Sequence, residues 1–457
     1  MKIVVSSPLD LDRYTTEFYT LAQSVRAAAK TGAANPIASF EQLVELGKTN
    51  KQLDANDQGV VQVVDWLWQY AFDQRASDIH LEPRRDMGAI RFRIDGVLHT
   101  VYQVPMTVMN AMTARIKLLG RMDVVERRRP QDGRIKTVRP GATQGLPGSE
   151  VEMRLATLPT AFGEKMVMRI FDPDNAVKTV EQLGFAPRDG QRWTDLIAQP
   201  HGIVLVTGPT GSGKTTTLYS TLKRPATDEV NITTIEDPIE MIEPSLNQTQ
   251  VQPALDFSFA EGVRALMRQD PDIIMVGEIR DLETAEMAIQ AALTGHLVLS
   301  TVHTNDSASA ITRMVDLGVP AYLISATLIG VLAQRLARTL CPACKQPDPS
   351  VTKERLNEVV APFRLDGNPR PYKPVGCLDC RMTGYRGRAG LYELLVLDED
   401  ARAAIHPTVD IDKLRRCGIE AGMHPLRMAG VIKVAEGVTT LDEVLRSTPA
   451  WEVGDRR

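Results

Sequence analysis

The chain has 457 residues, 43% hydrophobic and 24% charged, and 53 Lys+Arg against 57 Asp+Glu give a net charge of −4. This composition is ordinary for a globular protein of about three domains and excludes disorder over most of the length. No apolar run reaches the roughly 18 residues of a membrane span, and the first residues lack the apolar core of a signal peptide. We therefore expect a cytoplasmic protein with no general affinity for nucleic acid, whose contact with a membrane is peripheral.

The sequence pattern of the first third of the chain predicts a short helical segment (residues 1–55) followed by a mixed α+β domain (residues 56–173). Asp95-Gly96 stands between two strand-like runs, which is a strong β-hairpin signal, and Arg139–Gly148 is rich in Gly and Pro, as in a loop. The expected helices are Val60–Trp68, continuing to Phe72, and Met109–Leu119, and the expected strands are Ile79–Leu81, Ala89–Ile94, Val97–Val101, Val151–Leu155 and Lys165–Phe171.

The remainder predicts a linker (174–188), a core domain (189–340), a cysteine-containing subdomain (341–390) and a helical C-terminal region (391–457). Strands and helices alternate in the core, which indicates an α/β fold with a mostly parallel sheet and helices on both faces. The expected core elements are the strands Ile203–Thr207, Asn231–Ile235, Ile273–Val276 and Leu297–Thr301 and the helices Thr215–Leu222, Ser258–Arg268 and Thr284–Leu293. In the C-terminal region, Thr440-x-x-Glu443 before Val444 is a capping-box signature.

The strongest motif is a phosphate-binding loop between an apolar strand and a helix, the context that the motif requires. Glycines let backbone N–H groups turn toward phosphate oxygens, and the helix that follows directs its positive N-terminus at the same point. Lys214 would reach the β- and γ-phosphates, and the Thr215 hydroxyl would bind Mg²⁺. The residues expected to bind ATP are Gly208, Pro209, Thr210, Gly211, Ser212, Gly213, Lys214, Thr215 and Thr216.

Two strands end in acids that could polarise the attacking water. Glu278 follows Ile273–Val276, with Gly277 in the position where such motifs usually carry an acid, and it would either hold the Mg²⁺ hydration shell or orient water. Glu236 ends another apolar run and is the preferred candidate, because carboxylates at the C-terminal edge of a parallel sheet lie where ligands bind. The sequence does not separate the two, and each has a structural alternative: a salt-bridged strand end for Glu278, and a turn cluster before Pro238 for Glu236.

Histidine, arginine and cysteine supply the other candidates. His303 follows a strand and would sense the γ-phosphate, although a hydrogen-bonded structural histidine is the alternative. The domain at 56–173 is dense in arginine, including Arg134 and Arg154, and these side chains either form a solvated basic face or stabilise transition-state charge on the γ-phosphoryl group.

Two C-x-x-C pairs, Cys341/Cys344 and Cys377/Cys380, predict a structural zinc site with four thiolate ligands, redox chemistry being the alternative.

In this order, the motifs resemble the secretion-superfamily hexameric ATPases, among them the type II secretion ATPase GspE and the type IV pilus assembly ATPase PilB. The resemblance runs from about Ala76 to Leu445. Its motifs are Ser77–Pro83, Arg91–Gly96, Pro130–Arg134, Met153-Arg154, Gly163–Lys165, the phosphate-binding loop, Thr234–Glu240, Gly277–Asp281 and the histidine box that ends at His303.

The resemblance implies a RecA-like core behind a PAS-like α+β domain, packed between the subunits of a homohexamer. Arg134 and Arg154 would approach nucleotide held by a core domain. The ring would work under an inner-membrane platform protein and a membrane-anchored docking protein, with ATP, Mg²⁺ and Zn²⁺ bound.

ATP hydrolysis would then power a type II secretion pseudopilus or, alternatively, type IV pilus assembly. A nucleotide-gated scaffold with negligible turnover and a DNA-translocating motor are the other hypotheses. The low net charge and the lack of an aromatic–basic stretch disfavour the DNA motor.

Overall fold

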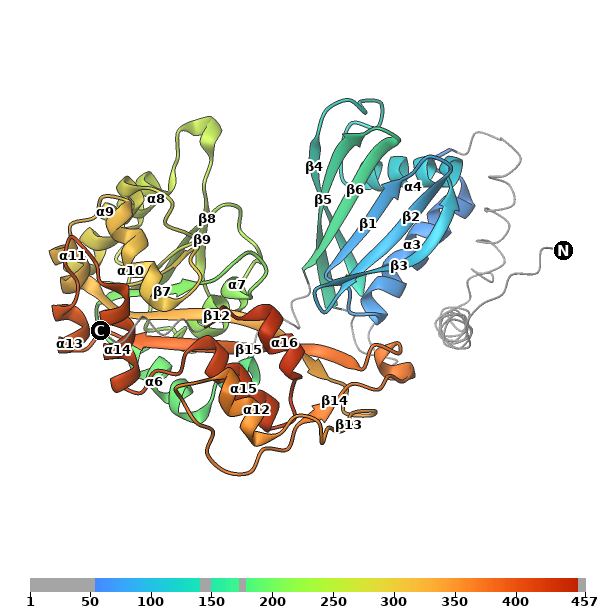
Figure 1. Ribbon diagram of the computed structural model, residues 1–457. Helices are drawn as coiled ribbons and strands as arrows, with labels where there is room; N and C mark the ends of the chain where they lie inside the picture. Colours follow the sequence, from blue (N-terminus) through green and yellow to red (C-terminus); the bar gives the residue numbers. More distant parts are fainter. Residues whose placement is uncertain (1–53, 140–148, 172–177, 451–457) are drawn as a thin grey trace. The chain divides into compact units, whose positions relative to one another are not determined.

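The computed structural model describes residues 54–139, 149–171 and 178–450, and the first 53 residues lie outside this range. The chain divides after residue 174 into two compact units, each with its own sheet (Figure 1). None of the helices in the described parts of the chain has the length and apolar character of a membrane span.

The first unit is a six-stranded antiparallel sheet in the order β3-β2-β1-β6-β5-β4, with two helices packed on one face. The predicted helices and strands are all present. Strand β4 was not predicted, because its alternation of charged and small residues carries little apolar signal. The elements are α3 (Gln58–Asp73), β1 (Asp78–Pro83), β2 (Met87–Ile94), β3 (Val97–Pro105), α4 (Met106–Leu119), β4 (Gln131–Arg139), β5 (Ser149–Thr160) and β6 (Gly163–Phe171). The mixed α+β character is confirmed, and the PAS-like class stays a prediction.

Alternation along these strands gives the sheet one apolar and one charged face. Ile79 and Leu81 are fully buried in the core with α3 and α4. The residues between them face the other way, and directly paired residues share a face. The register therefore aligns one charged row across five strands: Arg134, Arg154, Arg169, Asp78 and Arg93.

The second unit is built on a seven-stranded sheet in the order β15-β12-β7-β11-β10-β8-β9. All neighbouring strands run parallel except β12 and β15, which are antiparallel. The strands are β7 (Gly202–Thr207), β8 (Ile232–Glu236), β9 (Asn247–Gln250), β10 (Ile273–Val276), β11 (Leu297–Val302), β12 (Leu328–Leu340) and β15 (Tyr385–Val396).

Helices cover both faces of this sheet because its central strands are apolar on both sides. Ile203 and Leu205 enter one core, whereas Val204 and Val206 enter the other. The first core includes α8 (Phe259–Leu266), α9 (Leu282–Leu293), α10 (Ser307–Asp316) and α11 (Ala321–Thr327), and the second includes α5 (Val180–Leu183), α6 (Pro187–Ile197) and α7 (Lys214–Leu222).

Two expectations for this unit are corrected. Part of the expected linker is helical (α5, Val180–Leu183, and the first residues of α6), because Val180, Leu183 and Phe185 are buried in a core. The C-terminal region expected to be helical from residue 391 begins as strand, and β15 continues to Val396 in a long antiparallel ladder with β12. The sequence did not predict this pair because its hydrogen-bonding partners are about 50 residues apart.

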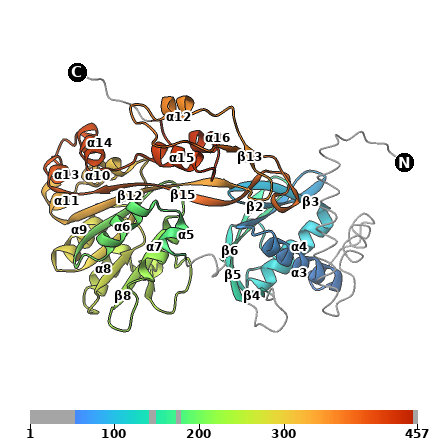
Figure 2. The same cartoon turned by 90° about the horizontal axis from the view of Figure 1, so that it is seen from below.

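The remaining elements lie between β12 and β15 in the chain or follow β15. Residues between the two strands form β13 (Gln346–Pro347), α12 (Lys353–Val359), β14 (Tyr372–Lys373) and the short η3 (Leu378–Cys380). The chain ends in α13 (Glu399–Ala403), α14 (Ile411–Glu420), α15 (Leu426–Ala435) and α16 (Leu441–Ser447). Figures 1 and 2 show α15 and α16 beside the two strands, which they contact. Thr440 accepts a hydrogen bond from the Glu443 backbone, which is the N-cap half of the predicted capping box, whereas the Glu443 carboxylate pairs with Arg338 and Arg446.

Candidate nucleotide site and cysteine cluster

The phosphate-binding loop joins β7 to α7 at the C-terminal edge of the sheet. Gly208, Gly211 and Gly213 have φ values of +151°, +79° and +89°, which residues with a side chain rarely adopt. A Cβ atom at Gly208 would also lie 2.5 Å from the Gln334 carbonyl oxygen. The sequence needs glycine here because the loop is both left-handed and pressed against the neighbouring strand β12.

Lys214 begins α7 and folds back over the loop. Its Nζ donates to the carbonyl oxygen of Gly208 at 2.7 Å and of Pro209 at 3.3 Å. Burial lowers the pKa of Lys214 to about 8, an effect that the Glu278 charge opposes. The ammonium group therefore rests on backbone carbonyls in a partly desolvated position, where an anionic ligand offers a stronger partner.

The donor set of this loop fits a polyphosphate. The Thr215 hydroxyl, on an exposed side chain in the first turn of α7, is accessible to a metal ion. The Ser212 hydroxyl is buried and has no hydrogen-bond partner among the described residues. Glycine-rich backbone at a helix N-terminus, one ammonium group and one accessible hydroxyl match the chemistry of Mg²⁺-nucleotide binding.

Glu278 and His303 meet at the ends of two adjacent strands. Glu278 follows β10 and His303 follows β11, and His303 Nε2 lies 3.5 Å from Glu278 Oε2. Arg280 forms an ion pair with the other carboxylate oxygen. The Glu278 side chain is 15% exposed and His303 is 52% exposed, so both are accessible from solvent. Because β11 is also hydrogen-bonded to β7, this pair lies on the same edge as the phosphate-binding loop.

Glu236 lies in a different environment, at the end of β8. It is 4% exposed, and both carboxylate oxygens accept hydrogen bonds from neighbouring side chains. Tyr219 donates to Oε2 at 2.6 Å, while Thr234 and Gln248 donate to Oε1 at 2.7 and 3.2 Å. Burial and the Glu236 charge together raise the pKa of Tyr219, so this hydroxyl stays a donor. A carboxylate held by three donors suits a structural role better than proton transfer.

Gly277 occupies the position after β10 where such motifs usually carry an acid. Its surroundings at the end of β8 explain why the acid comes one residue later, at Glu278. A Cβ atom there would lie 3.3 Å from the Ile235 carbonyl oxygen and 3.5 Å from Glu236 Cα. The Gly277 N–H also donates to that carbonyl at 2.8 Å. A side chain at residue 277 would thus press closely against the end of β8, and Glu278 carries the carboxylate that solvent reaches.

Arg134 and Arg154 belong to the first unit, in the charged row described above. Arg134 pairs with Glu152 at 3.5 Å, and the Arg154 guanidinium lies over the Phe171 ring, 4.8 Å from its centroid. In the middle of the row Asp78 pairs with Arg169 at 3.1 Å. Basic groups outnumber acidic ones in this row, so the face carries net positive charge.

Sequence reasoning missed several residues that support the site. Tyr219 and Gln248 hold Glu236, and Gln334 and Arg335 on β12 lie behind the phosphate-binding loop. Only the last two had a readable signal, because a Gln-Arg pair inside the apolar run Val331–Leu336 marks buried polar groups that need partners.

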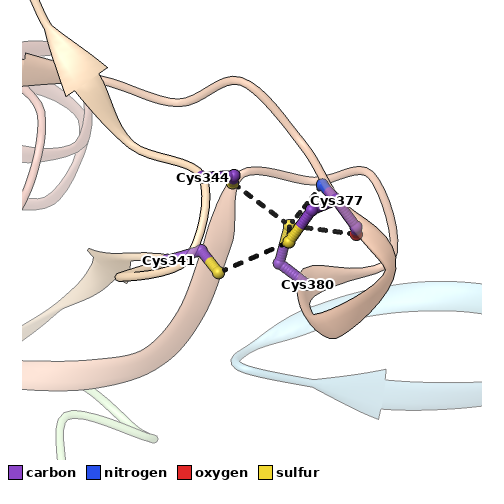
Figure 3. A group of neighbouring side chains, drawn as sticks. All are labelled: Cys341, Cys344, Cys377 and Cys380. Carbon is purple, nitrogen blue, oxygen red and sulfur yellow. Dashed lines mark hydrogen bonds between the residues drawn. The ribbon is translucent and has the colours of Figure 1, made fainter.

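Four thiols gather where β12 and β15 lead into the cysteine-containing segment (Figure 3). The sulfur atoms all lie within 4.8 Å of one another. Cys341–Cys377, Cys344–Cys380 and Cys377–Cys380 are separated by 3.8, 3.7 and 3.7 Å. A tetrahedral zinc ion with bonds of about 2.3 Å needs sulfur–sulfur separations of about 3.8 Å. The cluster is therefore compatible with zinc, as the sequence predicted.

The surroundings of the sulfurs also suit bound thiolates. The Gly376 N–H donates to Cys344 Sγ at 3.3 Å, and the N–H groups of Cys377 and Gly384 donate to Cys380 Sγ at 3.1 and 3.2 Å. Such bonds stabilise sulfur ligands from outside the coordination shell. Burial raises the pKa of the Cys377 thiol to about 12, so this sulfur requires a nearby cation to ionise at neutral pH.

Comparison with known proteins shows which family the chain belongs to. The family described as "Type II/IV secretion system protein" matches residues 54–446. The chain belongs to this family.

Named relatives cover most of the chain. The type IV pilus assembly ATPase TfpB of Acinetobacter baylyi is 54% identical over 450 residues, 98% of this chain and 76% of that protein. The type II secretion system protein E of Aeromonas hydrophila is 45% identical over 415 residues, 91% of this chain and 81% of that protein.

Solved structures agree with the fold of the family. The pilus retraction motor PilT with bound ADP has a TM-score of 0.57 at 25% identity, covering 85% of this chain and 97% of that one. The Legionella pneumophila ATPase DotB has a TM-score of 0.60 at 21% identity, covering 84% and 94%. The α/β ATPase fold predicted for the core is confirmed by these likenesses.

Proposed function

We propose that this protein is a Mg²⁺-dependent ATPase that powers the assembly of a pilus-like filament. The observation that carries this proposal is the meeting of a phosphate-binding loop with Glu278 and His303 at one sheet edge, in a chain of the secretion-ATPase family. A loop built to hold phosphates and an exposed carboxylate beside it are the two parts that hydrolysis of a phosphoanhydride requires.

In this proposal, backbone N–H groups of residues 208–215 hold the β- and γ-phosphates and Lys214 moves from the loop carbonyls to phosphate oxygens. The Thr215 hydroxyl is the protein ligand of Mg²⁺, and the ion, when bound, neutralises charge between the β- and γ-phosphates. We assign the water-orienting role to Glu278 and a structural role to Glu236, because three side-chain donors already occupy Glu236. His303, paired with Glu278, senses the γ-phosphate.

We further propose that the active form is a homohexamer in which Arg134 and Arg154 stabilise charge on the transferring phosphoryl group. The positive charge of their row and the planar donor geometry of guanidinium support this role. Zn²⁺ in the cysteine cluster is structural, since four protein thiolates leave no open coordination position.

The machine that this ATPase serves has two candidates, protein export through a type II secretion system and type IV pilus assembly. Relatives named for each match most of the chain, and the 54% identity to TfpB over 98% of it favours the pilus. In either machine the protein works at the cytoplasmic side of the inner membrane, under a platform protein and bound to a membrane-anchored docking protein.

The test is ATP hydrolysis by the Lys214→Ala variant beside the parent and a matched control. Lys223→Ala removes a lysine from the other end of the same helix, where it pairs with Glu243 on the surface. We expect Lys214→Ala to lose at least about 100-fold in rate and Lys223→Ala to keep it, because only Lys214 lies on the phosphate-binding loop. Hydrolysis by Lys214→Ala at the parent rate would overturn the site assignment.

Single-turnover measurement on the parent protein decides whether the site is catalytic. Release of phosphate from bound ATP supports the ATPase. Tight binding of ATP without phosphate release would instead support the nucleotide-gated scaffold.

A further inference from the structure

Strand β12 carries a buried polar pair directly behind the phosphate-binding loop. β12 is hydrogen-bonded to β7, the strand that leads into the loop. Gln334 is 1% exposed, and its side chain donates to the Ser212 carbonyl oxygen at 2.7 Å and accepts from Thr217 at 2.8 Å. One amide side chain therefore connects the loop to the helix that follows it.

Arg335, the next residue, lies between two loops of the site. It is 7% exposed, and its Nη2 donates to the Asn305 carbonyl oxygen at 2.7 Å, two residues after His303. Its Nη1 donates to the Gln334 carbonyl oxygen at 2.9 Å and lies 3.2 Å from where a Gly208 Cβ would be. The guanidinium thus lies close to Gly208 at the start of the phosphate-binding loop and is hydrogen-bonded to the backbone of the His303 loop.

The charge of this guanidinium is not cancelled by a direct partner. Among the ion pairs of the described residues, none includes Arg335. Asp306, the acid next to the Asn305 carbonyl, is paired with Arg415 at 2.6 Å. Glu393 is buried and accepts hydrogen bonds from Ser307 and from the Leu426 backbone. The charges of Glu393 and Asp306 act on Arg335 without forming a contact ion pair with it, and burial lowers the pKa of Arg335. A buried guanidinium that lacks a contact ion pair also attracts an anion held at the neighbouring phosphate-binding loop.

We propose that Arg335 is a positioning residue of the nucleotide site, with a positive charge that strengthens phosphate binding from behind the loop. It holds the His303 loop through the Asn305 carbonyl oxygen and lies beside Gly208 of the phosphate-binding loop. Its charge acts through the loop, in a region where low dielectric preserves electrostatic attraction. This inference rests on the proposed function of the loop as an ATP site.

Four variants of the full-length protein test it, with Mg²⁺-ADP and Mg²⁺-ATP affinities measured by titration. Arg335→Met removes the charge at similar volume, and Arg335→Lys keeps it. Arg338→Met is the matched control, because Arg338 lies on the same strand but pairs with Glu443 at 2.6 Å. Lys214→Ala tests the site itself. Thermal denaturation and ATP hydrolysis are recorded for all four.

We expect Arg335→Met to weaken ADP binding about tenfold and ATP binding more, because ATP carries one more negative charge. KM for ATP should rise more than kcat falls. Arg335→Lys should recover most of the affinity, and Arg338→Met should lose stability without losing affinity. If Arg335→Met does not fold, Arg335→Gln replaces it, since its amide can still donate to the Asn305 carbonyl oxygen.

Two results would overturn this inference without affecting the proposed function. The first is parent-like nucleotide affinity in Arg335→Met. The second is an equal loss of affinity in Arg335→Lys and Arg335→Met, because the effect would then not depend on the charge. Parent-like affinity in Lys214→Ala overturns the proposed function instead, so the two failures are distinguishable.

Discussion

The Nε2 atom of His303 lies 3.5 Å from the Oε2 atom of Glu278, at the carboxyl ends of two neighbouring parallel strands. The pair links β10 and β11, and β11 is in turn hydrogen-bonded to the strand that enters the phosphate-binding loop. Movement of either side chain therefore changes the electrostatic environment of the other. This geometry gives Glu278, and not Glu236, a partner that faces solvent at the site.

The two acids should respond differently to removal of their charge. Glu278→Gln should reduce steady-state ATP hydrolysis by about 100-fold or more while changing nucleotide affinity less than about threefold, because the amide cannot accept a proton. Glu236→Gln should mainly lower the melting temperature, because the amide disturbs the hydrogen bonds from Tyr219, Thr234 and Gln248. Hydrolysis rates, affinities and melting curves of both variants check this, and the reverse pattern would exchange the two roles.

The cysteine cluster should contain one zinc per chain. Metal analysis of the purified protein should find one equivalent, which Cys341→Ser or Cys377→Ser removes. Loss of the metal should lower the melting temperature by roughly 5 °C or more, because the ion joins two segments more than 30 residues apart in the chain. Cys417→Ser is the control, since Cys417 lies on α14, outside the cluster. A metal-free parent protein, or equal metal content in all variants, would contradict the zinc assignment.

The arginines of the first unit should affect catalysis more than nucleotide binding by the core. Arg134→Ala and Arg154→Ala should each reduce kcat for ATP about 100-fold or more, as expected for groups that stabilise transition-state charge. Lys136→Ala is the control, because Lys136 lies on the same strand as Arg134 but forms an exposed pair with Glu150. Sedimentation should show that the assembled state persists in each variant. Unchanged kcat in both arginine variants would contradict the catalytic role and indicate that the row is a solvated basic face.

The accuracy of the predictions from sequence depended on how far apart in the chain the interacting residues lie. The phosphate-binding loop, its strand and its helix are local and were predicted within a residue or two, because glycine spacing and apolar periodicity both lie within 20 residues. The β12–β15 pair joins residues such as Arg335 and Leu391, and a pairing over that separation leaves no local pattern. The roles of the two acids likewise depend on partners that are distant in the chain. Nothing near Glu236 in the sequence shows that Gln248 and Tyr219 donate hydrogen bonds to its carboxylate oxygens.

The paired strands β12 and β15 connect the two chemical centres of the second unit. Arg335 lies behind the phosphate-binding loop, and β12 ends at Leu340, immediately before the first cysteine of the cluster. The partner strand β15 starts at Tyr385, five residues after the last one. The seven residues from Gln334 to Leu340 are extended and span roughly 20 Å, at about 3.3 Å for each of the six steps. The same strand therefore supports the phosphate-binding loop near one end and leads into the thiol cluster at the other, so a metal bound there would anchor the end of the strand that packs behind the loop.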